Sequence, residues 1–161
     1  SVHRLDMDTS GVLVFALTEE AKRKLSMQFE RRETEKTYHA IVEGAILEEE
    51  GVIDKPIRLD VENRPYQIVD FVQGKSAITK YKRGKIYYKE GRLVTQLEVF
   101  PQTGRTHQIR VHLSSIGFPI VGDRLYGTNE GEERLYLHAF SLTFTHPTTE
   151  KRMCITAPCP F

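Results

Sequence analysis

Residues 3–11 read HRLDMDTSG, and the apolar run GVLVFAL begins at Gly11 and ends at Leu17. A nearly continuous apolar run of this length predicts a strand that is buried on both faces. Polar residues packed against the start of such a strand form a loop held by a rigid element, where binding and catalytic side chains are often placed. Arg4 and Asp6 are two residues apart, so an extended backbone directs both side chains to one side. The loop is therefore a candidate site.

A second interpretation of this loop is purely structural. Thr9, Ser10 and Gly11 can turn the chain and hydrogen-bond a neighbouring carboxylate. The segment would then be an Asx-type turn with a surface ion pair. Composition alone does not choose between the two interpretations.

The length and composition describe one ordinary globular domain. The chain has 161 residues, of which 39% are hydrophobic and 28% charged, and we expect one domain over residues 1–161. No apolar run reaches the ~18 residues that a membrane span needs, and no signal-peptide pattern opens the chain. We therefore expect a cytoplasmic monomer with no membrane contact. Cys154 and Cys159 do not make a disulfide framework or a zinc site, so we expect two reduced cysteines.

Charge is unevenly distributed along the chain, although the formal net charge is only +1. Residues 80–92 carry six cationic side chains and one acidic side chain, whereas residues 43–54 carry five acidic ones. A basic segment of this kind can face a phosphate backbone. It is also the pattern of a solvated hairpin whose charged side chains point outward.

Two helices and several strands are predicted. Thr18 is suited to cap a helix from about residue 19 to 32, and the two glutamates that follow it favour the helix dipole. A second helix is predicted from about residue 105 to 116, with Gly117 as its natural end. Strands are expected at residues 11–17, 37–43, 77–88, 93–100, 136–145 and 151–156. Sequentially adjacent strands with two helices favour an α+β fold with a largely antiparallel mixed sheet and flanking helices.

A second polar cluster, TGRTHQIRVH, covers residues 103–112 at the junction between a strand and the second helix. Free amides in the first helical turn, together with Arg105 and Arg110, would form an anion-binding corner. His107 and His112 are five residues apart, about 140° around a helix, so they do not form the i, i+4 pair of a zinc site. The alternative interpretation is an amphipathic helix with a polar outer face.

A third motif, KTYHA at residues 36–40, opens a predicted strand, where Tyr38 alone would be an ordinary core aromatic. Taken together, HRLDMDTSG, KTY, GKSAITKY at residues 74–81 and TGRTHQIRVH resemble the RluA-type family of pseudouridine synthases. The resemblance continues in family order to Ala157-Pro158. It implies the pseudouridine synthase catalytic fold, without the N-terminal strands that the family carries. We therefore expect that the chain starts inside a larger protein.

The resemblance also implies three catalytic residues and no metal or organic cofactor. Asp6 corresponds to the family's nucleophile. Tyr38 corresponds to the active-site tyrosine, which stacks on the base and is a candidate general base. Arg105 corresponds to the arginine that pairs with the aspartate, a pairing that stabilises the ionised carboxylate in a partly desolvated pocket.

The implied partner is structured RNA, ribosomal or transfer RNA, in which the target uridine leaves the base stack to reach Asp6. Arg4 is similar to the family residue that fills the space left by the flipped base. The further residues that we expect to contact RNA are His107, Arg110, Leu137 and Ile109. Asp8 stands at a position that the family motif leaves variable, so we expect no catalytic role for it.

Two other classes of function stay open at this point. A glycosidase-like hydrolase would use Asp6 and Asp8 as its carboxylate pair and would lose activity in Asp8→Asn. A non-catalytic RNA-binding module would keep its function in Asp6→Ala. The synthase interpretation predicts the opposite result for each substitution.

Overall fold

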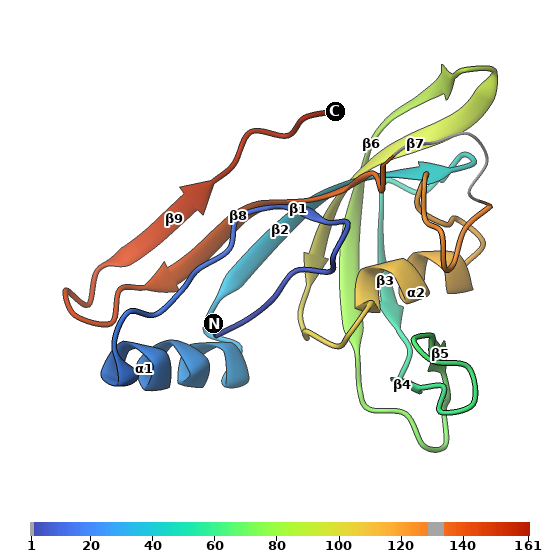
Figure 1. Cartoon of the computed structure of the whole chain (residues 1–161). Coiled ribbons are helices and arrows are strands. Elements are labelled where there is room, and N and C mark those ends of the chain that lie inside the picture. The colour runs from blue at the N-terminus through green and yellow to red at the C-terminus, as the bar shows by residue number, and fades with distance from the viewer. Residues whose placement is uncertain (1, 129–133) are drawn as a thin grey trace.

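The computed structural model describes residues 2–128 and 134–161, and a mixed sheet of seven strands runs through it. The order of the strands is β1-β8-β2-β7-β6-β3, and β9 pairs with β8 as well (Figure 1). Their bounds are β1 Ser10–Gly11, β2 Glu35–Glu43, β3 Glu50–Asp54, β6 Ile78–Lys89, β7 Arg92–Pro101, β8 Leu137–Thr145 and β9 Arg152–Thr156. Among the described strands only β1 and β8 pair in parallel. The predicted α+β fold with a largely antiparallel mixed sheet is confirmed.

The basic segment forms the hairpin of β6 and β7, as the sequence predicted. Lys89 pairs with Arg92, and the turn residues Glu90 and Gly91 have φ angles of 50° and 80°. Positive φ at both positions is the conformation of a type I′ turn, whose twist matches that of the flanking strands. A second, two-stranded sheet joins β4 (Ile57–Leu59) and β5 (Gln67–Val69).

Helix α1 (Glu19–Glu30) begins as predicted at Thr18, whose hydroxyl accepts a hydrogen bond of 3.0 Å from the amide of Ala21. Helix α2 (Gln108–Ser115) begins three residues later than predicted. His107 has a φ of 54°, and the side chain of Gln108 accepts from the amide of Arg105 at 3.0 Å. Residues 105–107 therefore form a loop instead of a helical turn. Neither helix in the described part of the chain is long and apolar enough to cross a membrane.

Both helices pack on the same face of the sheet. Ala40 in β2 pairs with Leu97 in β7, and both belong to the cluster that receives α2. Four positions earlier in β2, Lys36 pairs with Leu142 in β8, which packs against α1. Positions four apart in a strand point to one side, so the two helices share a face and leave a gap between them.

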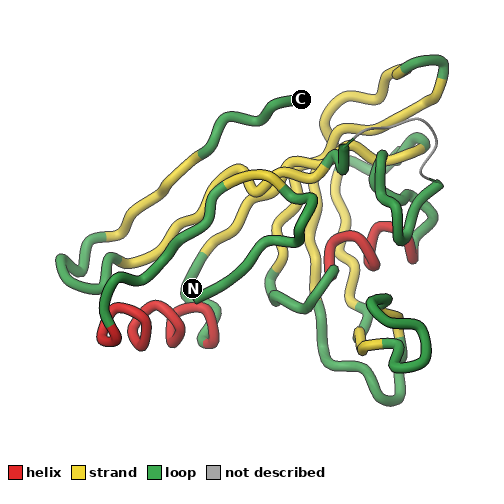
Figure 2. The backbone as a smooth tube through the Cα atoms, in the orientation of Figure 1, coloured by secondary structure: helices red, strands yellow, loops and turns green. Residues whose placement is uncertain are grey.

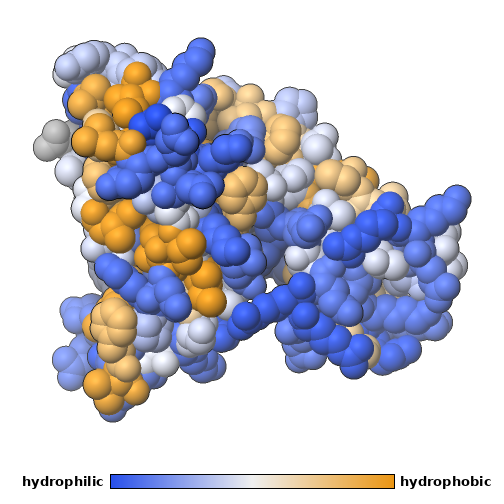
Figure 3. Space-filling view, turned by 180° about the vertical axis from the view of Figure 1, so that it is seen from behind, coloured by the Kyte–Doolittle hydropathy of each residue, from blue (hydrophilic) through white to orange (hydrophobic). Residues whose placement is uncertain are grey.

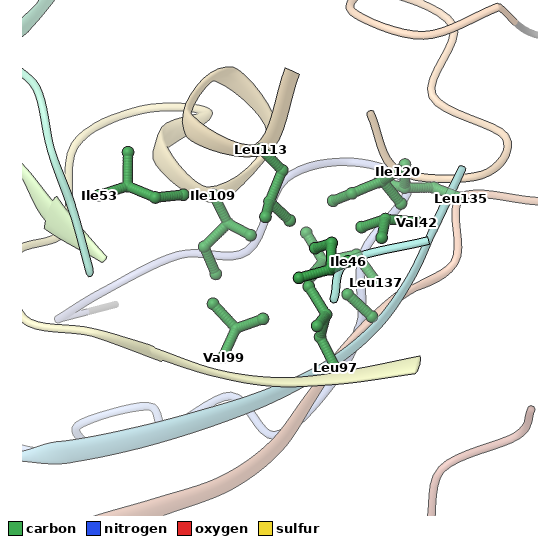
Figure 4. Close-up of a cluster of buried hydrophobic side chains, with 11 residues drawn as sticks. Val42, Ile46, Ile53, Leu97, Val99, Ile109, Leu113, Ile120, Leu135 and Leu137 are labelled. Atoms are coloured by element: carbon green, nitrogen blue, oxygen red, sulfur yellow. The ribbon is translucent and has the colours of Figure 1, made fainter. Parts of the chain in front are cut away.

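The main core lies between α2 and this face of the sheet. Ile109 and Leu113 point from α2 toward Leu97 and Val99 of β7, as Figure 4 shows. The side chain of Leu113 is fully buried. This packing fixes the first turn of α2 against the strands, which determines where its polar side chains lie.

The prediction of a strand buried on both faces at residues 11–17 is wrong. Only Ser10 and Gly11 pair with β8, and the chain continues as an extended loop to α1 (Figure 2). Val12 and Val14 pack toward the α1 cluster, whereas Phe15 is 62% exposed. The reason is that β9 occupies the edge of β8 from Ser141 onward, so the segment has no free strand to pair with.

His3 ties the loop before β1 to the rest of this region. Its Nε2 accepts a hydrogen bond of 3.0 Å from the amide of Val14, and its ring stacks on Phe29 of α1 at 4.7 Å. Burial, followed by the charge of Lys36, lowers the pKa of His3 to about 4. The neutral imidazole is therefore the form that holds the loop in place.

Replacing Leu113 with alanine will lower the free energy of unfolding by about 2–5 kcal/mol, because a fully buried side chain leaves a cavity. Leu47→Ala, at a side chain that is 75% exposed, serves as the control and will change stability by less than about 0.5 kcal/mol. Urea denaturation of the two variants and the wild type measures the difference. Equal effects of the two substitutions would contradict this account of the core.

The stability of the protein will fall as the pH drops from about 6.5 to about 4, and part of this slope will come from His3. The unfolded imidazole binds a proton in this window while the folded one does not, so the contribution is present above the window and lost through it. Urea denaturation across the window will show a shallower slope for His3→Gln, which retains an acceptor for Val14. An unchanged slope would mean that His3 titrates equally in both states.

Candidate active site

A cavity of about 970 Å³ lies in the gap between α1 and α2, on the helical face of the sheet. Seen from behind, the molecule is hollowed between the part that carries α1 and the part that carries β4 and β5, with mainly hydrophilic side chains beside the hollow (Figure 3). The cavity is lined by every site residue that the sequence predicted: Arg4, Asp6, Tyr38, Arg105, His107, Ile109, Arg110 and Leu137. Segments that are a hundred residues apart in the sequence therefore meet in one pocket.

The Asp6 loop is anchored by the short parallel pair of β1 and β8. The amide of Thr9 donates to the carbonyl of Asp6 at 3.0 Å, which closes a turn. Gly11 follows with a φ of 128°, and a Cβ at this position would collide with the carbonyl of Ala139. Only glycine fits such a close approach of two backbones. The chain direction at Asp6 is thus set by Gly11, five residues downstream.

The buried His138 also holds the contact between β1 and β8 in place. The Nε2 of His138 lies 2.9 Å from the carbonyl of Ala157, and its Nδ1 lies 2.8 Å from the hydroxyl of Ser10. A carbonyl only accepts, so Nε2 carries the hydrogen and Ser10 donates to Nδ1. Ser10 also accepts from the guanidinium of Arg134 at 3.0 Å. Ser10 therefore has a structural role here, and its hydroxyl does not bond a carboxylate.

Arg110 is the cation that pairs with Asp6. Its Nη1 lies 3.4 Å from the Oδ2 of Asp6, while its Nε and Nη2 donate to both carboxylate oxygens of Asp123 at 3.0 and 2.7 Å. Asp123 is fully buried and also accepts from the amides of Leu125 and Tyr126. A bidentate pair of this kind fixes the plane of the guanidinium, so the remaining nitrogen is held toward Asp6.

The prediction that Arg105 pairs with Asp6 is wrong, because the cation that pairs with Asp6 is Arg110. The Nε of Arg105 donates to the carbonyl of Ser76 at 2.9 Å, and Arg105 lies in the loop before α2. Arg110 lies in the first turn of α2, and its Nη1 is the cationic atom that reaches Asp6. The anion-binding corner expected from free amides is altered as well, because the amide of Arg105 is bonded to Gln108.

Tyr38 enters the pocket beside an irregularity in the sheet. Thr37 pairs with Ser141 and Tyr38 with Ala139, so β8 contributes one extra residue, Phe140, at this point. Bulges of this kind are common next to active sites, where they re-aim a side chain. Burial, and then the negative charge of Asp6, raises the pKa of Tyr38 to about 12. Tyr38 is consequently a protonated phenol at neutral pH.

His107 is held by a residue that sequence reasoning missed. The hydroxyl of Tyr126 accepts from the amide of Gln67 at 2.9 Å and lies 2.7 Å from the Nδ1 of His107. Burial lowers the pKa of His107 despite the opposing charge of Asp6. No local signal in the sequence connects Tyr126 with His107, because the contact depends on the chain turn after α2.

The pocket has a cationic rim and an apolar wall. Arg4 reaches across from the Asp6 loop, and its Nη2 donates to the hydroxyl of Thr106 at 3.0 Å. Ile109 and Leu137 are both buried and supply apolar surface. Asp8 is exposed and does not line the cavity, so the carboxylate pair of a glycosidase is not assembled here.

Comparison with known proteins places these features in a family. The family described as RNA pseudouridylate synthase matches residues 1–115. The dual-specificity RNA pseudouridine synthase RluA of Haemophilus influenzae is 43% identical over 162 residues, which cover 99% of this chain and 73% of that protein. The RluA of Escherichia coli is 45% identical over 164 residues, covering 100% of this chain and 74% of that protein.

The solved structures agree with the sequences. Human RNA Pseudouridylate Synthase Domain Containing 1 has a TM-score of 0.89 and 34% identity, with 99% of this chain and 69% of that chain covered. The expected pseudouridine synthase catalytic fold is thus confirmed. Since the family matches most of the chain and the relatives match almost all of it, the chain belongs to the RNA pseudouridylate synthase family.

Proposed function

We propose that this chain converts specific uridines in structured RNA to pseudouridine, with Asp6 as its nucleophile. The observation that carries the proposal is the ion pair of Asp6 with Arg110, which the buried Asp123 holds, in a pocket that also contains Tyr38. The relatives named above are RNA pseudouridine synthases, which supports ribosomal or transfer RNA as the substrate class.

The reaction needs no redox partner, because its atoms and electrons balance within the nucleoside. The bond between N1 of uracil and C1′ of ribose breaks, and a bond from C5 to C1′ forms. The hydrogen at C5 leaves as a proton, and N1 gains one. A carboxylate serves this reaction whether it attacks the ribose, attacks the base or assists elimination. Asp6 is a carboxylate of the pocket that lies 3.4 Å from the Nη1 of Arg110.

Tyr38 has a role at the uracil ring in this proposal. Its position on β2 opposite Val99 places the aromatic side chain in the cavity near the charge of Asp6. Since the pKa of the phenol is raised to about 12, the phenolate that would act as a general base is scarce at neutral pH. In this proposal the protonated phenol stacks on the base and donates a hydrogen bond from its hydroxyl.

The substrate uridine would enter this pocket flipped out of its stack, at a cost of about a few kcal/mol. A cavity of about 970 Å³ has room for a nucleotide. Arg4 is suited to fill the vacated place because it is exposed and is held only by Thr106 in the described structure. Arg105 and His107 at the rim are then contacts for RNA, and Ile109 and Leu137 form the wall beside the base.

Asp6→Asn will lower kcat by about 10³-fold or more, since the amide is uncharged and a poor nucleophile. Asp8→Asn removes a charge two residues away and will leave kcat within about twofold. The measurement is release of tritium from C5 of uridine in labelled RNA from cells that lack the protein. Release of free uracil without tritium, lost equally in both variants, would favour a glycosidase-like carboxylate pair. A wild type that binds RNA but releases no tritium would favour a non-catalytic RNA-binding module.

Asp123→Asn will reduce kcat by about tenfold or more with a smaller effect on KM, because Arg110 loses the charged partner that orients it toward Asp6. Glu62→Gln, at an exposed position, is the matched control for loss of one carboxylate. Combining Asp123→Asn with Asp6→Asn will cost little beyond Asp6→Asn alone. Additive losses in this cycle would show that Asp123 acts independently of Asp6.

A further inference from the structure

The lysine that opens strand β2 lies in the pocket without an anionic partner. Lys36 lines the cavity, and its Nζ has one polar contact, a long hydrogen bond of 3.4 Å to the carbonyl of Thr103. Within residues 2–128 and 134–161 no carboxylate forms an ion pair with it. Burial lowers the pKa of this lysine. Lys36 is half-buried. A partly desolvated ammonium with so little compensation is costly, and a ligand that supplies an anion relieves the cost.

The acidic side chains around Lys36 do not supply the missing anionic partner. Asp6 is paired with Arg110, which is itself tied to Asp123. Glu30 and Glu35 line the same cavity but are exposed to solvent. The cavity also contains the cations Arg4, Arg32 and Arg105. The pocket as a whole is therefore suited to a ligand that carries negative charge.

The position of Lys36 relative to Tyr38 suggests which part of the substrate would meet it. Residues two apart in a strand share a face and are about 6.6 Å apart along it. A base stacked on Tyr38 would place the sugar-phosphate of the same nucleotide within reach of the lysine.

We propose that Lys36 binds a backbone phosphate directly next to the flipped uridine and so positions the nucleotide over Asp6. This inference rests on the proposed function. Lys36 then acts on substrate binding and placement, and takes no part in making or breaking bonds. The alternative is a structural lysine that only holds the loop at Thr103.

The test combines variants of the protein with a change in the substrate. The probe is a stem-loop RNA containing one uridine that the protein converts, prepared with normal phosphates or with a single uncharged methylphosphonate beside that uridine. Tritium release from C5 gives kcat and KM for the wild type, Lys36→Met, Lys36→Arg and Lys22→Met. Lys22 is exposed on α1 and does not line the cavity, so its variant controls for the loss of one positive charge.

With normal phosphates, Lys36→Met will lower kcat/KM by about tenfold, mainly through KM, and will reduce the salt slope of log kcat/KM by about 0.7. Lys36→Arg will recover part of the loss, and Lys22→Met will behave as the wild type. With the methylphosphonate, the wild type will fall to the level of Lys36→Met, and that variant will lose nothing more.

Three results would overturn the inference. A wild type that is indifferent to the charge of each flanking phosphate contradicts it without reference to any variant, even if Lys36→Met folds poorly. Equal losses of Lys36→Met on both substrates would indicate the structural role. A wild type that releases no tritium from any RNA would remove the proposed function and this inference with it, whereas the first two results leave the proposed function intact.

Discussion

The pairing of Arg110 with the buried Asp123 is the constraint on which the site depends. A buried ion pair adds little to stability on average, because the desolvation of two charges offsets their attraction. Its value here is directional, since two hydrogen bonds fix the guanidinium and leave Nη1 for Asp6. The ring of Tyr126, whose centroid is 5.4 Å from the guanidinium carbon, restricts it further. The carboxylate of Asp6 therefore meets a cation that is already oriented before a substrate arrives.

The sheet supplies the other half of this geometry. The parallel contact of β1 with β8 holds the Asp6 loop, and the antiparallel contact of β8 with β2 brings in Tyr38 at the position of the extra residue Phe140. Strand β8 thus sets the separation between the Asp6 loop and Tyr38. The helices complete the pocket because they share a face of the sheet, and Phe29 of α1 and Ile109 and Arg110 of α2 line the space between them.

Much of the fold follows from local signals in the sequence. Thr18 and Gly91 placed the start of α1 and the β6–β7 turn correctly, because capping and positive φ are properties of single residues. Residues 11–17 were assigned wrongly, since an apolar run does not reveal that β9 occupies the edge of β8. The later start of α2 depends on the side chain of Gln108, which a periodicity argument does not include.

The candidate site shows the same division between local and three-dimensional information. The side chains that motif matching selected all line one cavity. It assigned the ion pair of Asp6 to Arg105, however, because two arginines five residues apart in one motif are equivalent until the start of the helix is known. Arg110 is distinguished by Asp123, which lies thirteen residues later and meets it only after the chain turns at the end of α2. A partner that is created by tertiary structure has no signature in a linear pattern, and this is why the cation that orients Asp6 had to be found in the structure.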